Sequence, residues 1–307
     1  MNLHRSLCVV AVVLAFIVVV MGAYVRLSDA GLGCPDWPFC YGKPVPADIA
    51  DSHALAKAWK EMGHRYLAGT LGLLIVALAI AAWRLRRSAS LAASIVAVVI
   101  VQATLGAWTV TMLLKPAIVT AHLVGGMTTL SLLAWLALSQ WPHAQAPEMR
   151  GARLLSAVAL TAVAIQVVLG GWVSANYAAL ACPEYPRCPG PMDFANAFHV
   201  VRELGQTADG QLLSLDALRA IHWAHRLFAN VALLVVIFAA FRAWRLERRL
   251  ALVVVALVLV QFSLGIANVA LSLPLPLAAA HNAGAAALLL SLVVLNFFAF
   301  RGLRPSW

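Results

Sequence analysis

The stretch GAYVRLSDAGLGCPDWPFC at positions 22–40 decides how this chain folds, because it returns as GGWVSANYAALACPEYPRC at positions 170–188. Cys34 in the first copy corresponds to Cys182 in the second, and another cysteine follows at the same spacing in each copy. A stretch that returns once, at a long interval, indicates a chain built from two copies of one structural unit. We therefore predict two related halves, residues 1–145 and residues 146–307.

Each copy also carries two histidines, with an arginine directly after the first of them. The corresponding residues are His64, Arg65 and His122 in the first half and His225, Arg226 and His281 in the second half. The repeat thus preserves residue types that can carry chemistry. It predicts a pseudo-symmetric pair of sites.

Composition places the chain in a membrane. Of its 307 residues, 63% are hydrophobic and only 11% are charged, which is more apolar surface than a soluble domain of this size can bury. Apolar runs of about 20 residues, long enough to cross roughly 30 Å of hydrocarbon, occur four times in each half. We predict an all-α integral membrane protein with eight transmembrane helices in two four-helix bundles. The predicted spans are 8–27, 62–83, 91–112, 117–140, 152–176, 219–244, 250–271 and 276–299.

Charge gives the orientation and excludes nucleic acid as a partner. With both termini inside, the inner segments hold twelve arginines and only Glu148 and Glu247, so the whole formal charge of +10 lies on that side. Topology then accounts for the basic balance. The arginines are Arg5, Arg84, Arg86, Arg87, Arg150, Arg153, Arg242, Arg245, Arg248, Arg249, Arg301 and Arg304.

Four of the five cysteines fall on the outer side, in two Cys-x5-Cys loops. An even number of thiols in an oxidising compartment predicts disulfides, Cys34–Cys40 and Cys182–Cys188. Spacing alone leaves open whether each pair is a structural staple or a redox-active pair beside a reaction site. Intermittent apolar residues beyond each loop, such as Leu55 and Phe194, predict short interfacial helices or a solvated linker.

The four repeated histidines are the strongest chemical signal. Each stands at a similar distance from the inner end of its span, so all four imidazoles are predicted at one depth, near the outer hydrocarbon boundary. A lone histidine in a membrane most often makes an interhelical hydrogen bond, but four at one level favour ligands. Haem iron fits this pattern, because two facing helices can supply axial ligands to a flat ring. Zinc is disfavoured, since each cluster has only two histidines.

Three further features concern the residues around these histidines. Arg65 and Arg226 could bind haem propionates or simply anchor the helices at the interface. Glu61 precedes His64 by one helical turn where the second half has His222, so it is either an acid–base group or an interfacial carboxylate. Three glutamines in Gln-x-x-Leu-Gly contexts predict interhelical hydrogen bonds; they are Gln102, Gln166 and Gln261.

Over residues 8–300 the chain resembles the haem A synthases of bacteria and mitochondria. The resemblance rests on Glu-x-x-His-Arg in the second span, His-Arg in the sixth, a histidine in the fourth and in the eighth, and the outer cysteine pairs. It implies an oxidoreductase of the bacterial inner membrane that converts a methyl group of haem O to the formyl group of haem A, for terminal oxidases. Haem O synthase would be the donor.

The same resemblance implies a division of labour between the halves. The first half, 1–145, would hold the substrate haem O through His64 and His122, with Arg65 beside it. The second half, 146–307, would hold haem b as a cofactor through its own residues His225, His281 and Arg226. Glu61 would then be the catalytic group.

Two other classes of function stay open at this point. A di-haem membrane cytochrome that only relays electrons would also need paired histidines, although it has no use for Glu61 in one half only. A quinone-linked disulfide oxidoreductase would explain the outer cysteines but not the level histidines. The electron donor and any homo-oligomer are likewise left open by the sequence.

Overall fold

A computed structural model describes residues 3–46, 49–142, 144–145, 150–244, 247–301 and 303–304. Within these ranges eight helices are long and apolar enough to cross a bilayer, which confirms the predicted all-α membrane architecture. They are α1 Leu3–Leu27, α2 Ser52–Arg84, α3 Ala89–Thr111, α4 Pro116–Leu138, α5 Arg150–Ala175, α7 Leu215–Ala243, α8 Arg248–Ala270 and α9 Leu275–Arg301. A single-turn helix, α6 Phe194–Ala197, and two-residue antiparallel strands β1 Ala144–Gln145 and β2 Leu303–Arg304 complete the described elements.

The second helix of each half begins before its predicted span: α2 begins at Ser52 and not at residue 62, and α7 begins at Leu215 and not at residue 219. α2 starts at Ser52, where the Asp51 side chain accepts a hydrogen bond from the backbone nitrogen of His53, so Leu55 lies in its first turns and not in a separate interfacial helix. In the second half only α6, which begins at Phe194, forms a short helix in the corresponding stretch. Hydropathy misses the polar first turns of α2 because they project beyond the hydrocarbon.

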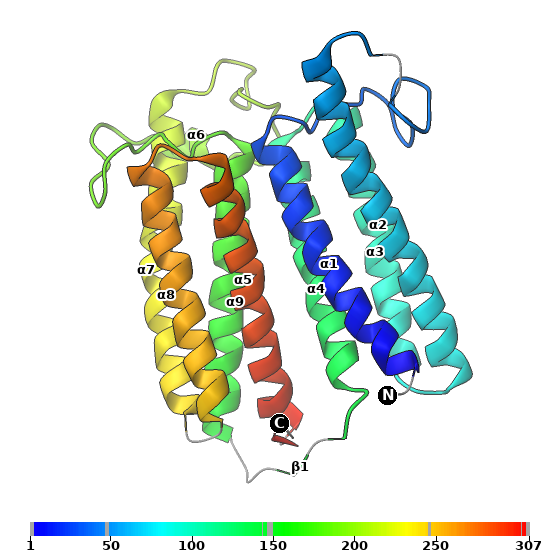
Figure 1. Cartoon of the computed structure of the whole chain (residues 1–307). Helices are drawn as coiled ribbons and strands as arrows, with labels where there is room; N and C mark the ends of the chain where they lie inside the picture. Colours follow the sequence, from blue (N-terminus) through cyan, green and yellow to red (C-terminus); the bar gives the residue numbers. More distant parts are fainter. Residues whose placement is uncertain are drawn as a thin grey trace.

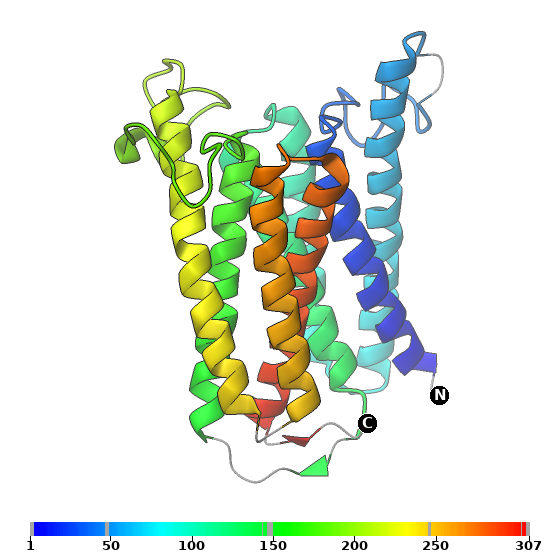
Figure 2. The ribbon, with the colours of Figure 1, turned by 60° about the vertical axis from the view of Figure 1, so that its left-hand side comes forward.

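Each half is a ring of four neighbouring helices (Figures 1 and 2). In the first half α1 packs on α2 and α4, and α3 packs on α2 and α4. In the second half α5 packs on α7 and α9, and α8 packs on α7 and α9. The halves meet where α1 lies against α9 and where α4 lies against α5 and α9. The same neighbours therefore recur in both halves, while the pseudo-symmetry itself and the boundary between 145 and 146 stay predictions.

One continuous apolar core joins the two halves toward the end that carries the termini. Aromatic rings meet there edge to face, with 5.1 Å between the ring centroids of Trp135 and Phe297 and 5.4 Å between those of Phe297 and Phe298. Leu133 of α4 and Leu292 of α9 are fully buried in the same cluster. We call this the inner end; the opposite end, which carries the cysteine loops, is the outer end.

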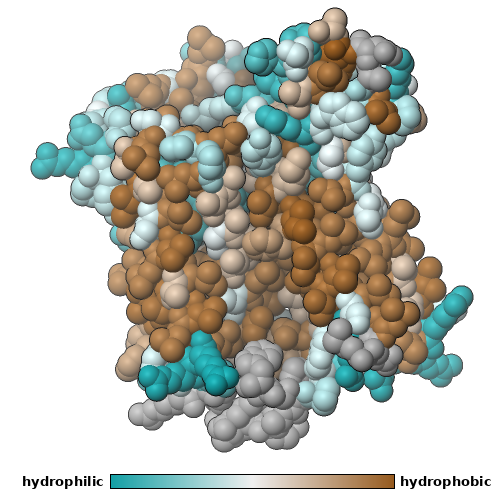
Figure 3. Space-filling model, viewed as in Figure 1, coloured by the Kyte–Doolittle hydropathy of each residue, from teal (hydrophilic) through white to brown (hydrophobic). Residues whose placement is uncertain are grey.

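The surface matches a multi-pass membrane protein. On the face that Figure 3 shows, a hydrophobic band covers the middle of the helices and hydrophilic residues gather toward both ends. Both ends of the described chain, Leu3 and Arg304, lie at the inner end (Figure 1). Among the charged residues used to predict the orientation, Arg245 and Glu148 lie outside the described residues.

Candidate functional site

The outer part of the first half encloses a cavity of about 650 Å³ between α1, α2, α3 and α4. Glu61, His64 and Arg65 of α2 line it together with Gln102 of α3 and His122 of α4. A cavity of this size falls in the range of small-molecule and cofactor sites, and it has an imidazole on each of two helices.

A second cavity, of about 480 Å³, occupies the corresponding place in the second half. His222, His225 and Arg226 of α7 line it, as do Gln166 of α5 and His281 of α9. The structure therefore brings the four predicted histidines together as two pairs, one pair in each cavity. Their roles as ligands stay predictions.

Glycines on neighbouring helices make room for the imidazoles in the first half. A Cβ atom at Gly22 of α1 would lie 2.9 Å from Cε1 of His64, and one at Gly106 of α3 would lie 3.0 Å from Cε1 of His122. Real Cβ atoms essentially never approach as closely as 2.9 Å, so a larger residue at Gly22 would displace the ring or its helix, and one at Gly106 would require the His122 ring to shift by a few tenths of an ångström.

The second half repeats this arrangement. A Cβ at Gly170 of α5 would lie 3.1 Å from Cε1 of His225, and one at Gly265 of α8 would lie 3.2 Å from Cε1 of His281. Each histidine thus packs against a glycine of an adjacent helix, which fixes the plane in which the imidazole can lie. Three of these glycines, Gly106, Gly170 and Gly265, end the Gln-x-x-Leu-Gly contexts of the sequence, but their contacts with the imidazoles were not predicted.

The ring nitrogens of the imidazoles have few hydrogen-bond partners among the described residues. Nδ1 is buried without a hydrogen-bond partner among the described residues in three rings, those of His64, His122 and His281. The predicted interhelical contacts of the glutamines are present: Nε2 of Gln102 donates to the backbone oxygen of His122 at 2.7 Å, and Nε2 of Gln166 donates to that of His225 at 3.1 Å. Gln166 also contacts Nδ1 of His225 at 3.1 Å, and Gln261 contacts Nε2 of His281 at 3.4 Å. The buried ring nitrogens that lack a partner among the described residues fit a ligand-binding role.

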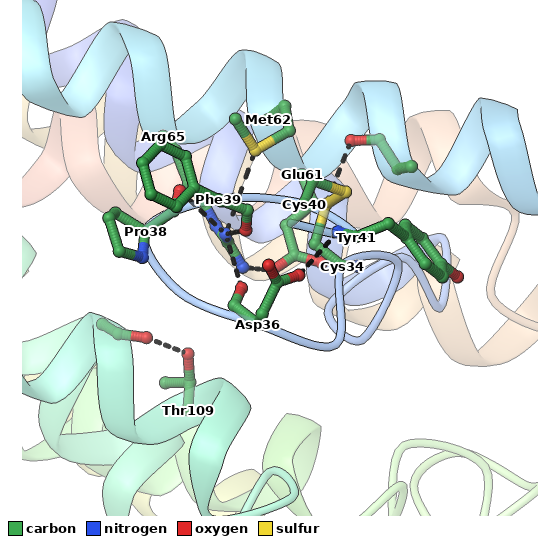
Figure 4. Close-up of polar contacts among 12 residues, drawn as sticks. Cys34, Asp36, Pro38, Phe39, Cys40, Tyr41, Glu61, Met62, Arg65 and Thr109 are labelled. Atoms are coloured by element: carbon green, nitrogen blue, oxygen red, sulfur yellow. Dashed lines mark hydrogen bonds and ion pairs between the residues drawn. A yellow bond between two sulfur atoms is a disulfide. The ribbon is translucent and has the colours of Figure 1, made fainter. Parts of the chain in front are cut away.

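At the outer end of the first half, Glu61 joins the cysteine loop to α2 (Figure 4). Its Oε2 accepts a hydrogen bond from the backbone nitrogen of Cys34 at 2.8 Å, and its Oε1 pairs with Nη2 of Arg65 at 2.5 Å. Arg65 in turn donates from Nη1 to the backbone oxygens of Asp36 at 2.9 Å and Phe39 at 2.7 Å. We call Glu61, Arg65 and these loop contacts the first clasp.

The second half has a clasp of the same construction built on histidine. Nδ1 of His222 lies 3.3 Å from the backbone nitrogen of Cys182, and its Nε2 lies 3.1 Å from Nε of Arg226, so both ring nitrogens face donors. Arg226 also donates to the backbone oxygens of Cys182 at 2.5 Å and Glu184 at 2.6 Å. Glu61 and His222 differ in residue type at corresponding positions of the repeat. The structure shows that both side chains nevertheless hold a cysteine loop to their helix.

The first cysteine loop has one more fixed group, the carboxylate of Asp36. It accepts hydrogen bonds from the backbone nitrogens of Tyr41 at 2.6 Å and Gly42 at 2.8 Å. Partial loss of water pushes the pKa of Asp36 upward, but these bonds and the neighbouring Arg65 outweigh it and hold the pKa below its usual value. Asp36 therefore stabilises the turn in its ionised form.

Both predicted disulfides form in the structure, Cys34–Cys40 and Cys182–Cys188. Cys34 and Cys40 are fully buried against Ala58 and Met62 of α2. Disulfide exchange needs an attacking thiolate to reach a sulfur atom, so burial favours the staple interpretation of the first pair.

Arg26 of α1 was not singled out by its sequence pattern, yet it lines both cavities where the halves meet. Its Nη2 donates to the backbone oxygens of Ser174 at 3.0 Å and Ala175 at 3.4 Å, and its guanidinium lies 4.0 Å from the ring centroid of Tyr177. Nε is buried without a partner among the described residues. A cation with a spare donor at the junction of two cavities is suited to an anionic group.

The family model of cytochrome oxidase assembly proteins, COX15-CtaA, matches residues 5–293. The chain belongs to this family. A relative from Shewanella oneidensis, named heme A synthase, is 40% identical over 94% of this chain and 94% of its own length. Relatives with the same name from Caulobacter vibrioides and Alkalihalophilus pseudofirmus are 28% and 26% identical, and they cover 95% and 99% of this chain. The family resemblance inferred from the motifs is confirmed.

The family match covers both cavities. The matched range includes all four histidines and both clasps, so the whole candidate site lies in the part that the family shares. Within the described residues no group of three or more histidine, cysteine, aspartate or glutamate side chains is placed to hold a metal ion directly. Each cavity offers one imidazole from each of two helices, a donor set that could hold haem iron.

Proposed function

We propose that this protein is a haem A synthase, which oxidises a methyl group of haem O to the formyl group of haem A by successive hydroxylation. The observation that carries the proposal is the pair of cavities, each lined by two imidazoles that pack on glycines at the outer end of a four-helix bundle. The names of the relatives supply the reaction class. The product would serve terminal oxidases.

We assign the substrate to the first half, 1–145, and a haem b cofactor to the second half, 146–307. His64 and His122 would hold the iron of haem O, and His225 and His281 would hold that of haem b. The residues fit these groups, because each cavity offers imidazoles from two different helices and glycines that leave space beside them. Haem b, when bound, would supply electron transfer to or from the substrate haem.

The arginines would act at the outer edge of the two sites. Arg65 and Arg226 bind backbone oxygens of the cysteine loops. Both side chains also line the cavities, so a haem propionate could reach them from inside the cavity. Arg26 has the spare donor, Nε, and faces both cavities. We assign Arg26, with Arg65 and Arg226, to the haem propionates.

Glu61 would assist the oxidation from the outer wall of the first cavity. Both of its oxygens accept hydrogen bonds from the clasp, and each keeps a further lone pair for a proton or a hydroxyl group of the oxidised methyl. Because Arg65 and the Cys34 backbone hold this carboxylate in place, it needs little reorganisation to act as a base.

Further parts of the proposal concern the surroundings of the enzyme. We place the protein in the bacterial inner membrane with both termini in the cytoplasm, which follows from the arginine-rich inner segments. Haem O is lipophilic and would arrive within the bilayer, with haem O synthase as the donor. The disulfides would staple the outer loops over the two sites.

The experiment that tests the function is pigment analysis of the purified protein from cells grown with and without a haem O supply. We expect haem b in both preparations, and haem A together with its alcohol precursor only where haem O is present. The matched control is His64→Ala, which should keep haem b and lose haem A. Haem b without any haem A would favour the electron-relay cytochrome, and absence of haem from an intact protein would favour a disulfide oxidoreductase.

A further inference from the structure

The walls of the two cavities differ at one seam between helices. When His64 is aligned with His225, Gly72 of α2 corresponds to Leu233 of α7. When Gln102 is aligned with Gln261, Ala103 of α3 corresponds to Phe262 of α8. Gly69 likewise corresponds to Asn230. The first half thus carries small residues where the second half carries larger ones. We call Gly69, Gly72 and Ala103 the lateral window.

The lateral window connects the first cavity with the membrane-facing surface. All three of its residues line the cavity, and Gly69 and Ala103 are also exposed on the outside of the bundle, between α2 and α3. Gly69 lies five residues from His64, which is about 8 Å along the helix toward the inner end, at 1.5 Å per residue. The exposed side of this seam therefore faces hydrocarbon and not water.

The corresponding seam of the second half is filled. Leu233 and Phe262 both line the second cavity, and neither is exposed. The Nδ2 atom of Asn230 donates to the backbone oxygen of Arg226 at 2.9 Å, which holds that side chain along α7. The larger side chains agree with the smaller volume of the second cavity, about 480 Å³ against about 650 Å³.

Packing within the protein does not require the glycines of the lateral window. A Cβ at Gly69 or Gly72 would meet no atom within 4 Å, unlike a Cβ at Gly22, which would press on His64. Glycine inside a helix costs about 1 kcal/mol relative to alanine. Two such residues, side by side on one helix and facing a cavity, therefore leave space for something other than the protein.

We propose that the lateral window receives the farnesyl tail of haem O, an inference that rests on the proposed function. The imidazoles of His64 and His122, whose Nδ1 atoms have no hydrogen-bond partner in the described part of the chain, line the same cavity and would hold the macrocycle. The tail then passes between α2 and α3 into the lipid, where its apolar surface is stable. Haem b has no such tail, so Leu233 and Phe262 can close the second site around it. The window is thus the element that selects the substrate.

The test uses the full-length protein in detergent with its resident haem b, titrated with haem O and separately with added haem B as a probe without the tail. The variant Gly72→Leu/Ala103→Phe gives the first seam the residues of the second. We expect its affinity for haem O to fall about tenfold or more, because the tail loses its buried path, while its affinity for the added haem B stays at the wild-type value. Ala77→Phe, which adds bulk at an exposed position of α2 that does not line the cavity and lies on another side of the helix from Gly72, is the control and should bind both haems normally.

The spectrum of the resident haem b reports whether the variant is folded, and the single variant Gly72→Leu replaces the double one if that spectrum is lost. Wild-type affinity of the folded variant for haem O would overturn the proposal, as would an equal loss of both haems. Failure of the proposed function looks different. In that case His64→Ala would leave the binding of both added haems unchanged, because the first cavity would not be a haem site.

Discussion

Glu61 and His222 occupy corresponding places at the outer ends of α2 and α7, and each joins the backbone nitrogen of a loop cysteine to an arginine of its own helix. The two clasps use different chemistry for the same mechanical result. A carboxylate can accept several hydrogen bonds and carries charge, whereas a neutral imidazole can accept through one nitrogen only. In the second half both imidazole nitrogens face donors, so the tautomer cannot satisfy both contacts at once.

The difference between Glu61 and His222 helps to distinguish a structural role in holding the loop from a catalytic role. If a clasp were all that is needed, either residue would serve in either half. The carboxylate stands in the half with the larger cavity and the lateral window, and the imidazole stands in the half with the closed seam. The shared role means that a variant of Glu61 has to preserve the clasp before a loss of activity can be attributed to catalysis.

The largest effect should come from the axial ligands of the second half. His225→Ala removes the imidazole that packs on Gly170, so haem b should no longer bind stably and haem A production should stop with it. The visible spectrum and the pigment content of the purified variant measure both losses. His64→Ala, the matched change in the first half, should keep the haem b spectrum. A normal low-spin spectrum in His225→Ala would break the assignment of the two halves.

The next effect separates the two roles of Glu61. Glu61→Gln keeps an oxygen and an amide for the clasp but cannot take up a proton, so the cysteine loop and haem b should be retained, while haem A output falls by roughly 10²–10⁴ through loss of acid–base help. Haem O or its alcohol should accumulate in the extracted pigments. Glu61→His gives the first clasp the residue of the second, and because an imidazole can still exchange protons, its output should exceed that of Glu61→Gln. Wild-type output from both folded variants would reduce Glu61 to a part of the clasp.

These two predictions depend on features that the sequence reveals to different degrees. Apolar runs predict the eight spans because each helix has to cover the same hydrocarbon thickness, and the repeat predicts which histidines form pairs. The clasps could not be predicted in the same way, since the partners of Glu61 and Arg65 are backbone atoms of a loop, and backbone atoms leave no mark in residue type. Arg26 was missed because its place between the cavities depends on how the two halves pack.

A smaller effect should follow from crowding the imidazoles. Gly22→Ala places a Cβ 2.9 Å from Cε1 of His64, and Gly170→Ala places one 3.1 Å from Cε1 of His225. Overpacking costs about 1–3 kcal/mol, which at the closer contact exceeds the gain of about 1 kcal/mol from alanine in a helix, so Gly22→Ala should unfold at a lower temperature. Gly170→Ala should require the His225 ring to shift by a few tenths of an ångström. Only Gly170→Ala should also perturb the haem b spectrum. Gly72→Ala, where the Cβ meets nothing, is the control and should raise the stability by about 1 kcal/mol. A Tm for Gly22→Ala at or above that of Gly72→Ala would contradict the role of Gly22.

The smallest effect concerns the difference between the two outer loops at acid pH. Because the pKa of Asp36 is lowered in the folded loop, its contribution to loop stability is complete above the usual aspartate pKa near 3.8 and is lost as the pH falls through the lower folded value. The backbone amides of Tyr41 and Gly42 should therefore become less protected against hydrogen exchange below about pH 4, after correction for the intrinsic pH dependence of exchange. Asp36→Asn should show the weaker protection already at neutral pH. Glu184→Gln, at the corresponding place in the second loop, should leave the hydrogen exchange of that loop unchanged, because no hydrogen bond of the Glu184 side chain is present among the described residues. Equal protection of Tyr41 and Gly42 in Asp36→Asn and the wild type at neutral pH would show that the first clasp and the disulfide hold the loop without Asp36.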